Sequence, residues 1–455
     1  MACAIPSPSF RLTRIAVAFG AGVCALGSTI GADSRWLAAL GREIVKLGSI
    51  PSGIPYAAAP SVDWVNVPVL GELVFHWLQG LGGDRGLLVA QLVATTAALA
   101  ILAVDMRSAR APDAAGAVVL VAVFFAALPS FIVVRAQLFS LVLFCLVLVL
   151  LRAEARAPSR RIWLLVPLVA LWANLHGAVL IGLAVSAAYL LLDRARREPL
   201  VASGVLLASG AALFLTPALL HSAEYYLGVM RNESAARGEG LWAPLSFHAP
   251  FDVLFIVLAV PLVAFALRSR LRLWELCSVA ALAAVTVHAG RNGVWLVCLL
   301  AAPAACGLGQ VLLGGLAVSR RTVVLCGVPT LALLVVGLAQ PPPQGGASLP
   351  VRDRAVALAG GRPILADGLD AEQLALDGHR VWIANPLDAF TRRDQRRYLD
   401  WLAGKPSGDS LLEASGRVVL VTRGTPPDRR LASMPLYRRV ARDSEAVLYL
   451  RRSGP

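Results

Sequence analysis

The sequence predicts a polytopic α-helical membrane protein of about 11 transmembrane helices followed by a small C-terminal α/β domain. Of the 455 residues, 57% are hydrophobic and only 15% are charged, and the mean hydropathy is +0.69. Soluble domains average about 45–50% apolar and about 25% charged residues. Apolar runs long enough to cross a bilayer as helices recur as far as residue 339, after which the composition changes abruptly.

The first apolar run follows Arg11 and Arg14, which is also the arrangement of a secretory signal. We interpret it as a retained first span, because no small-residue cleavage site precedes the further apolar runs. The seven cysteines show no paired spacing, so the sequence predicts neither a disulfide framework nor a zinc site. The predicted spans are 15–31, 84–104, 115–131, 136–152, 162–175, 177–193, 200–217, 250–267, 273–288, 292–311 and 322–339.

Basic residues cluster before the first span and in alternate loops, such as Arg152 to Arg161 and Arg268 to Arg272. The positive-inside rule places these clusters and the N-terminus in the cytoplasm. That topology requires residues 67–81, "VPVLGELVFHWLQGL", to form an interfacial or re-entrant helix on the outer face. The net charge of +14 is then explained by topology and anionic lipid, without a nucleic-acid partner.

The chain therefore divides into a transmembrane domain (1–340), a Pro/Gly linker (341–350) and an extracytoplasmic domain (351–455). In the last domain, "RPILADG", "HRVWIAN", "GRVVLVT" and "EAVLYLRR" are predicted as strands and "TRRDQRRYLDWLAG" as an amphipathic helix. Strands alternating with helices indicate an α/β fold. No glycine-rich phosphate loop opens its helices, so nucleotide binding is not predicted.

Polar residues gather at the predicted outer ends of the spans, which indicates a polar cavity opening outward, since ionisable groups near membrane depth are costly. Taken singly, each has a structural alternative: helix-end hydrogen bonds, a snorkelling arginine or interfacial aromatics. The members of this set are Asp33, Arg35, Asp63, Trp64, Asn66, Glu72, Arg135, Asn174, His176, His221, Glu224, Trp242, His248, His288, Arg291 and Asn292.

The order of these motifs resembles bacterial membrane proteins of the GT-C glycosyltransferase superfamily, in particular a branch with a C-terminal soluble domain. The resemblance covers residues 12 to about 340, and the tail also fits that branch. The segments that carry it are "GADSRWLAALGREIVKLGSIP", "PYAAAPSVDWVNVPVLGELVFHWL", "RAQLFS" (135–140), "WANLHG" (172–177), "WAPLSF" (242–247) and "GRN" (290–292).

The resemblance implies transfer of a sugar from a polyprenyl-phosphate donor to an envelope glycan, lipid or protein at the outer face of the inner membrane. It implies that Asp33, at the position of the superfamily's first-loop acid, is the general base, with Asp63 as second choice. Arg135, Arg291 and His176 are candidates to hold the phosphate. The other candidates for substrate binding are Arg35, Glu72, Asn174, His221, Trp242, His248, His288 and Asn292.

This sequence departs from the superfamily pattern next to the predicted base. Ser34 and Arg35 follow Asp33, where relatives often carry a second acid, and we therefore predict no cofactor and no requirement for a divalent metal. Two alternatives from other classes stay open: a transporter or flippase of lipid-linked intermediates, and a membrane scaffold whose C-terminal domain recruits envelope proteins. Against the transporter, the halves show no convincing internal repeat.

Overall fold

The computed structural model describes residues 11–61, 63–311, 320–340 and 345–452. The residues ahead of the first predicted span and the start of the predicted linker, 1–10 and 341–344, lie outside this part. Contacts divide the chain into two compact units, which we describe separately. Unit 1 comprises Met1–Ser28, Leu88–Leu215 and Leu241–Pro341, and unit 2 comprises Thr29–Leu87, Thr216–Gly240 and Pro342–Pro455.

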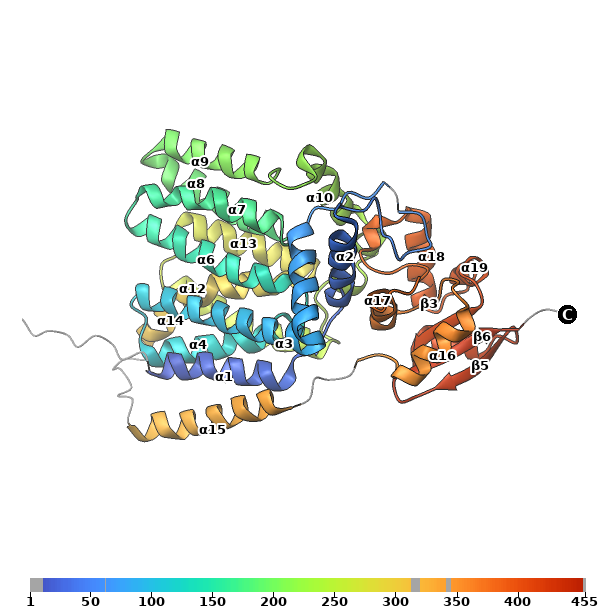
Figure 1. Cartoon of the computed structure of the whole chain (residues 1–455). Helices are drawn as coiled ribbons and strands as arrows, with labels where there is room; N and C mark the ends of the chain where they lie inside the picture. The colour runs from blue at the N-terminus through green and yellow to red at the C-terminus, as the bar shows by residue number, and fades with distance from the viewer. Residues whose placement is uncertain (1–10, 62, 312–319, 341–344, 453–455) are drawn as a thin grey trace, which may run out of the picture. The chain divides into compact units, whose positions relative to one another are not determined.

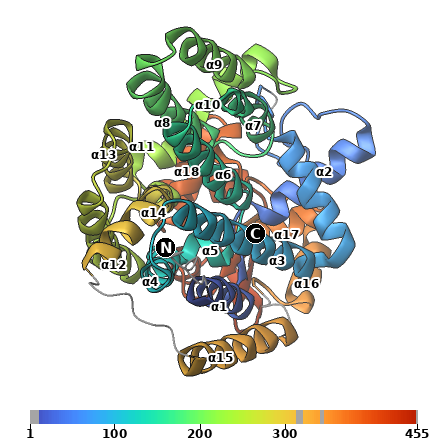
Figure 2. The ribbon, with the colours of Figure 1, turned by 90° about the vertical axis from the view of Figure 1, so that its left-hand side faces the viewer.

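Unit 1 is built of helices that run roughly parallel to one another in Figure 1 and are seen close to end-on in Figure 2. Helix α12 approaches α14 so closely that a Cβ at Gly307 would lie 1.8 Å from the carbonyl oxygen of Phe265. Its elements are α1 (Arg11–Gly27), the second half of α3 (Val69–Ser108), α4 (Asp113–Ala126), α5 (Leu128–Ile132), β2 (Val133–Val134), α6 (Gln137–Arg156), α7 (Leu165–Ala173), α8 (Val179–Leu192), α9 (Pro199–Ala212), α12 (Pro250–Arg268), α13 (Leu273–His288), α14 (Gly293–Val311) and α15 (Arg320–Ala339).

Among the described residues, five helices are long and apolar enough to cross a membrane. They lie at Val69–Ser108, Gln137–Arg156, Pro250–Arg268, Gly290–Val311 and Arg321–Ala339. Each of the other predicted spans coincides with a shorter helix; the span expected at 162–175, for example, contains a 3₁₀ turn, Arg160–Leu164, followed by α7. The number of eleven crossings stays a prediction.

Helix α3 joins the predicted interfacial helix to the predicted second span. Its backbone departs from helical geometry at Gly82 and at Gly83, whose φ is +57°. Glycine adopts this conformation without the steric penalty that a side chain would add. The two glycines therefore separate two helical segments close to the boundary expected from the sequence, near residue 81.

Three buried acids of unit 1, Asp105, Glu154 and Glu275, form ion pairs with arginines. Arg152, on α6, forms ion pairs with Asp105 and Glu275, and its Nε lies 3.0 Å from Oε1 of Glu275. Arg194, in the turn after α8, pairs with Glu154 at 3.1 Å. These side chains are almost completely buried. Because an isolated buried charge costs several kcal/mol, the pairs allow ionised groups inside an apolar helix bundle.

Unit 2 combines two segments from the first 240 residues with the C-terminal part of the chain. Their apolar residues form one core: Trp36 and Tyr56 belong to the same buried cluster as Leu365, Val419 and Leu448. Its helices are α2 (Ser34–Leu47), the first half of α3, α10 (Ser222–Arg231), α11 (Glu233–Arg237), α16 (Leu349–Ala359), α17 (Gly368–Leu376), α18 (Arg392–Leu402), α19 (Asp409–Ala414) and α20 (Pro426–Ala432).

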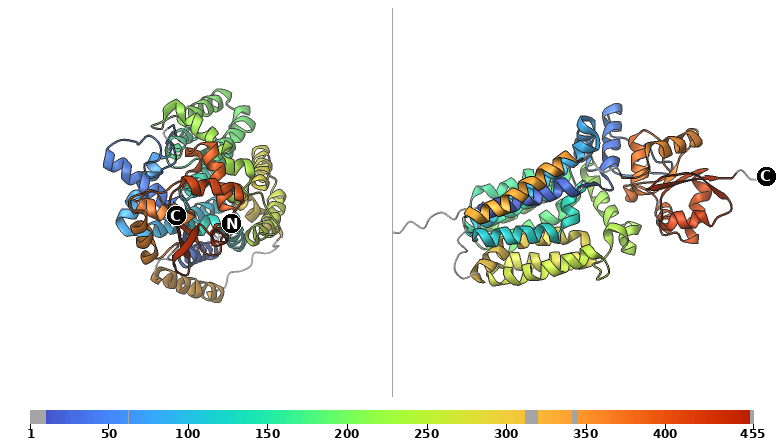
Figure 3. Two further views of the ribbon diagram at one scale, coloured as in Figure 1. Left: turned by 90° about the vertical axis from the view of Figure 1, so that its right-hand side faces the viewer. Right: turned by 90° about the horizontal axis from the view of Figure 1, so that it is seen from below.

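The sheet of unit 2 has four strands in the order β3-β4-β6-β5, and Figure 3 shows helices on either side of it. Strand β3 is parallel to β4, and the other two pairs are antiparallel. The register pairs Leu365 with Val419 and Leu420 with Leu448. The strands are β3 (Leu365–Ala366), β4 (Val418–Thr422), β5 (Tyr437–Arg442) and β6 (Ala446–Arg451), and the unit also contains the short β1 (Thr29–Ile30).

The strands of the C-terminal part differ from the prediction in two places, and its helices α16, α17, α19 and α20 were not predicted. The segment "HRVWIAN" forms no strand; Val381 makes single bridges to Ala57 and Ile364 instead. Pairing stops there because Val381 exchanges its backbone bonds with the first-loop residues Tyr56 and Ala58, a contact invisible to local pattern. Strand β5 was missed because its arginines face solvent and hide the alternation of apolar residues. The expected helix is α18.

Candidate active site

Asp33 lies at the start of α2, where its φ of +83° places it in the left-handed region. Its side chain does not cap the helix. After burial, the negative charge of Asp33 is one cause of the raised pKa of Glu372, Asp388 and Tyr225, all in unit 2. We call Asp33, Glu72, Tyr225, Glu372 and Asp388 the Asp33 cluster. The cluster brings together side chains from α2, α3, α10, α17 and the loop before α18.

Electrostatics in the Asp33 cluster favour the protonated forms of Tyr225 and Asp388. Burial raises the pKa of Tyr225 well above its usual value, and the negative charges of Asp388, Glu72 and Asp33 add to the effect. Burial also raises the pKa of Asp388, although a hydrogen bond from Trp64 Nε1 to its Oδ2, 3.1 Å long, partly offsets this. Burial and neighbouring negative charge thus act in the same direction on both groups.

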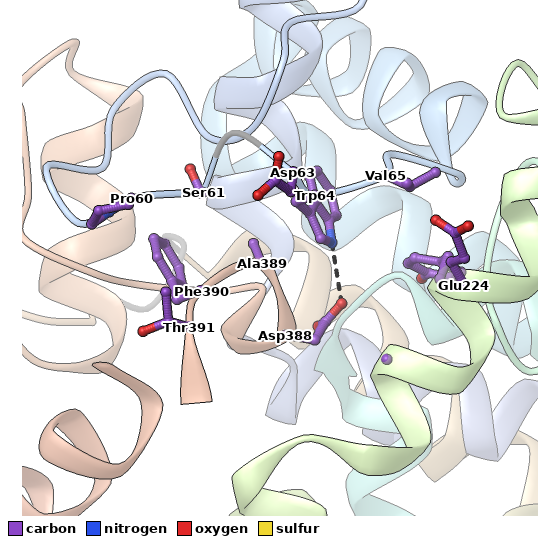
Figure 4. Close-up of a pocket in the computed structure, with 12 residues that line it drawn as sticks. Pro60, Ser61, Asp63, Trp64, Val65, Glu224, Asp388, Ala389, Phe390 and Thr391 are labelled. Atoms are coloured by element: carbon purple, nitrogen blue, oxygen red, sulfur yellow. Dashed lines mark hydrogen bonds between the residues drawn. The ribbon is translucent and has the colours of Figure 1, made fainter. Parts of the chain in front are cut away.

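A cavity of about 330 Å³ lies beside this cluster. Figure 4 shows Trp64 turned towards Asp388, with Asp63 beside it and Glu224 on the neighbouring helix α10. Aromatic side chains of Trp64, Tyr225 and Phe390 and carboxylates of Asp63, Glu224 and Asp388 line the cavity. Aromatic faces and carboxylate acceptors together suit a ligand that has both C–H faces and hydroxyl or amino donors.

The remaining predicted residues of unit 2 take different places. Asp63 is exposed at the cavity, and Glu72 is fully buried and accepts a hydrogen bond of 2.8 Å from Asn66 Nδ2. A Cβ at Gly41 would lie 2.2 Å from the carbonyl oxygen of Glu72, so α2 packs closely on this part of α3. Arg35 is buried in an ion pair of 2.7 Å with Asp84. His221 is exposed and contacts Glu224.

In unit 1, the motifs "RAQLFS" and "WANLHG" meet through one hydroxyl group. Trp172 Nε1 donates to Ser140 Oγ at 2.6 Å, and Ser140 Oγ lies 2.7 Å from His176 Nδ1. Because the hydroxyl oxygen accepts from the indole, its proton is available to Nδ1. We assign the neutral ring the tautomer that carries its proton on Nε2, which leaves Nε2–H as a donor.

One arginine, Arg291, acts on His176 in unit 1. Burial lowers the pKa of this histidine, which lies in the turn between α7 and α8, and the positive charge of Arg291 lowers it further. The Arg291 guanidinium lies 3.8 Å from the centre of the Trp242 ring, a cation–π contact. Within the described residues, Arg135 Nε is buried without a hydrogen-bond partner. We call Arg135, His176, Trp242 and Arg291 the cationic group.

The loop that carries Trp242 is attached to the turn that carries Arg291. The amide of Gly290 donates to Ala243 O at 3.0 Å, and the amide of Leu245 donates to Val287 O at 3.3 Å. The motifs "WAPLSF" and "GRN", which are separate in the sequence, thus form one local structure. This attachment explains why Arg291 stacks on Trp242.

Other predicted residues of unit 1 make helix-end contacts. Asn174 Nδ2 donates to the carbonyl oxygens of Ala170 and Leu215, at 2.8 and 2.7 Å. Asn292 bonds to the carbonyl of Ala289 in its own turn. His248 and His288 are exposed. The hydrogen bonds of Asn174 and Asn292 therefore match the structural alternative, a contact at a helix end. A part of these four residues in substrate binding stays a prediction.

Sequence reasoning missed Glu372, Asn385 and Tyr225 and did not single out Asp388. Asn385 and Asp388 follow the apolar segment "VWIA", and polar residues at the end of such a segment are a usual signal of a site. Glu372 gave no signal, since it looks like an ordinary polar residue of an amphipathic helix. Its role depends on contact with Asp33, 339 positions away in the chain.

The carboxylates of the Asp33 cluster are of the residue type that binds hard metal ions. In the parts of the chain that the structure describes, no group of three or more His, Cys, Asp or Glu side chains is arranged to hold one. These residues do not fit a metal site, and metal independence stays a prediction.

Comparisons with known proteins give matches in structure only. No family model matches the chain, and no curated protein matches it. The structure of ArnT from Cupriavidus metallidurans bound to undecaprenyl phosphate matches with a TM-score of 0.53 and 15% identity, over 97% of this chain and 98% of that chain.

Two further solved structures are similar. The oligosaccharyltransferase from Archaeoglobus fulgidus, in complex with Zn and sulfate, has a TM-score of 0.56 and 12% identity, over 90% of this chain and 68% of its own. Arabinofuranosyltransferase AftD from Mycobacteria has a TM-score of 0.54 and 14% identity, over 96% of this chain and 41% of its own. The chain therefore has a GT-C-like fold, as the sequence motifs predicted.

Proposed function

We propose that this protein is a membrane glycosyltransferase that moves a sugar from a polyprenyl-phosphate carrier to an envelope glycan, lipid or protein. The proposal places it in the inner membrane with about eleven crossings, the N-terminus in the cytoplasm, and the Asp33 cluster and the C-terminal part on the outer side. The GT-C-like fold supports the class of reaction. The observation that carries the chemistry is the position of Asp33 among proton-holding side chains beside a cavity.

In this proposal the acceptor hydroxyl attacks the anomeric carbon of the donor sugar. The new C–O bond forms as the bond to the carrier phosphate breaks, and the bonding electron pair leaves with the phosphate. The hydroxyl proton goes to the carboxylate of Asp33, which acts as general base. Attack from the side opposite to the phosphate inverts the anomeric centre. No step requires an oxidant, a reductant or a bound metal.

The cationic group of unit 1 is proposed to hold the leaving phosphate. Arg135 and Arg291 supply positive charge and guanidinium donors, which suit phosphate oxygens. His176 supplies Nε2–H, and its Ser140 partner fixes this tautomer. The lowered pKa of this residue keeps the ring neutral. A neutral ring can donate one hydrogen bond, from Nε2–H, without acting as an acid.

The cavity beside Trp64 is proposed to bind the acceptor. A volume of about 330 Å³ lies at the lower end of the usual range for small-molecule sites, about 300–1,000 Å³, and suits one or two sugar units. Trp64 offers a flat face whose orientation is fixed by its hydrogen bond to Asp388. The carboxylates of Asp63 and Glu224 can accept bonds from acceptor hydroxyls.

A mass-spectrometric profile of envelope glycans and polyprenyl-phosphate sugars tests this proposal. Cells lacking the gene would be complemented with wild type, Asp33→Asn, or Asp353→Asn as a control at an exposed acid of α16. We expect one glycan to lose a residue and its lipid-linked donor to accumulate, with rescue by wild type and by the control only. Rescue by Asp33→Asn would refute the assignment of the base. An unchanged profile in the deletion would refute sugar transfer itself.

A further inference from the structure

The backbone of Asp33 is held by a side chain from the C-terminal part of the chain. The left-handed conformation of Asp33 is unfavourable for a residue with a Cβ, and its own carboxylate makes no capping bond that would compensate. Its amide instead donates to Glu372 Oε1 at 2.8 Å. Asn385 Nδ2 donates to the same oxygen at 2.9 Å. One carboxyl oxygen therefore fixes the turn that presents Asp33.

Glu372 belongs to α17, and α17 is attached to α2 at a second point. Arg42, two turns along α2, donates to the carbonyl oxygens of Leu376 and Ala375 at the end of α17. These carbonyls belong to the last turn of the helix, where a cation is favourable. The two helices are thus attached to one another at two points, which leaves the Asp33 turn little freedom to rotate.

The environment of Glu372 suits a neutral carboxyl. The side chain is fully buried, and within the described residues it has no ion-pair partner and its Oε2 has no hydrogen-bond partner. Burial raises its pKa to about 8, and the negative charge of Asp33 adds to this. The charge of Glu372 in turn contributes to the raised pKa of Tyr398, on α18, after burial and the charge of Asp367. A protonated Glu372 can lie beside Asp33 without repelling its negative charge.

We propose that Glu372 is a positioning residue for Asp33: its buried carboxyl, supplied by the C-terminal part of the chain, holds the left-handed turn that presents the general base. This inference rests on the proposed function for its catalytic meaning. It makes the C-terminal part a component of the active site, because that part then does more than recognise an acceptor or a partner. Glu372 touches no substrate in this account and acts only through Asp33.

A series of substitutions separates the features of Glu372. Glu372→Gln keeps the oxygen at the same reach and stays neutral. Glu372→Asp keeps the carboxyl but is one methylene shorter, so it loses the contact, and Glu372→Ala removes the acceptor. Gln373→Ala is the matched control on the same helix, since the Gln373 side chain bonds only to Asp377 in the described structure.

The first measurement is hydrogen exchange of the full-length protein in detergent micelles, followed by mass spectrometry of peptides covering residues 29–37. We expect the Asp33 amide to exchange tenfold or more faster in Glu372→Asp and Glu372→Ala, and at the wild-type rate in Glu372→Gln and Gln373→Ala. Equal protection in all variants would overturn the positioning role. A rise in exchange over every peptide in Glu372→Ala would show unfolding, and Glu372→Asp and Glu372→Gln then decide the question.

The second measurement is the glycan profile of cells complemented with the same variants. We expect Glu372→Gln and Gln373→Ala to restore the profile, and Glu372→Asp and Glu372→Ala to restore a tenth of it or less. Failure of Glu372→Gln would overturn the proposal, because it keeps the bond to Asp33. If Asp33→Asn restores the profile, the proposed function fails, whereas the exchange experiment still decides whether Glu372 holds the turn.

Discussion

Three buried acids of unit 1 and Glu372 of unit 2 differ in whether an arginine balances their charge. In unit 1, Asp105, Glu154 and Glu275 each contact an arginine. In unit 2, Glu372 is equally buried but has no ion-pair partner among the described residues, and its pKa is raised to about 8. Paired buried charges satisfy one another and stabilise a fold only modestly. Unpaired carboxyls lower stability when ionised, so their presence around one residue is typical of a functional site.

The largest expected effect comes from removing the shared arginine of unit 1. Arg152→Ala leaves Asp105 and Glu275 buried without their partner, which typically costs about 3–5 kcal/mol. We expect a drop in the melting temperature of the purified protein in detergent. Arg156→Ala, one turn further along the same helix and exposed, is the control and should melt like wild type. Equal stability of the two variants would show that the pairs of unit 1 are not structural.

The second prediction concerns the pH dependence of stability that Glu372 contributes. Its folded pKa of about 8 lies above the usual value of 4.5, so the folded state binds more protons between these two values. The contribution is present in full below about pH 4.5 and is lost as the pH rises through about 8, with about 1.4 kcal/mol for each pKa unit.

Thermal melts between pH 6 and 8.5 check this prediction. Wild type should lose stability across this range, and Glu372→Gln, which cannot ionise, should show a flatter profile. Burial raises the pKa of Asp367 to about 6. Its contribution to stability is therefore also lost as the pH rises, but at a lower pH than that of Glu372. Parallel profiles of wild type and Glu372→Gln would mean that Glu372 does not titrate in this range.

A smaller effect is expected at Ser140, which links two motifs of unit 1. Ser140→Ala leaves Trp172 Nε1 without its acceptor and His176 Nδ1 with only the longer bond from the Ala178 amide, 3.4 Å, a loss of about 1–2 kcal/mol. We also expect a fivefold or greater loss of sugar transfer, since the histidine tautomer is then held less firmly. Ser186→Ala, whose hydroxyl bonds only within its own helix in the described structure, is the control. Wild-type transfer by Ser140→Ala would separate His176 from the reaction.

The smallest effect is expected at Trp64. Trp64→Phe keeps an aromatic face but removes the 3.1 Å bond to Asp388, which typically contributes about 0.5–1.5 kcal/mol. That bond lowers the pKa of Asp388, so the pKa should rise further in the variant. We expect weaker acceptor use, seen as partial restoration of the glycan profile. Trp64→Ala should restore less than Trp64→Phe, and the reverse order would argue against acceptor binding on this face.

The sequence predicted the apolar helices of unit 1, helix α18 and the strands β3, β4 and β6 from local pattern. Composition and spacing are sufficient for these features, since apolar runs and alternation are properties of neighbouring residues. The same reasoning could not place Glu372 against Asp33 or Val381 against Tyr56. Those contacts join segments that are distant in the sequence. The residue pattern within one segment does not indicate which other segment it contacts.

The candidate site shows the same limit. Asp33, Asp63 and Glu72 were singled out from the first loop, whereas Tyr225 and Glu372 were identified only from the structure. Charge alone also could not separate Arg35, which pairs with Asp84, from arginines that remain candidates for phosphate. Whether an ionised group is balanced depends on the fold, so this distinction could not be drawn from the sequence.

One measurement tests most directly whether the acids of unit 2 serve function and those of unit 1 serve structure. Asp33→Asn and Asp105→Asn would be compared in the same preparation, by melting temperature in detergent and by restoration of the glycan profile in cells. The account predicts that Asp33→Asn melts like wild type but restores nothing, and that Asp105→Asn melts several degrees lower. An Asp33→Asn variant that restores the profile, or melts as low as Asp105→Asn, would contradict it.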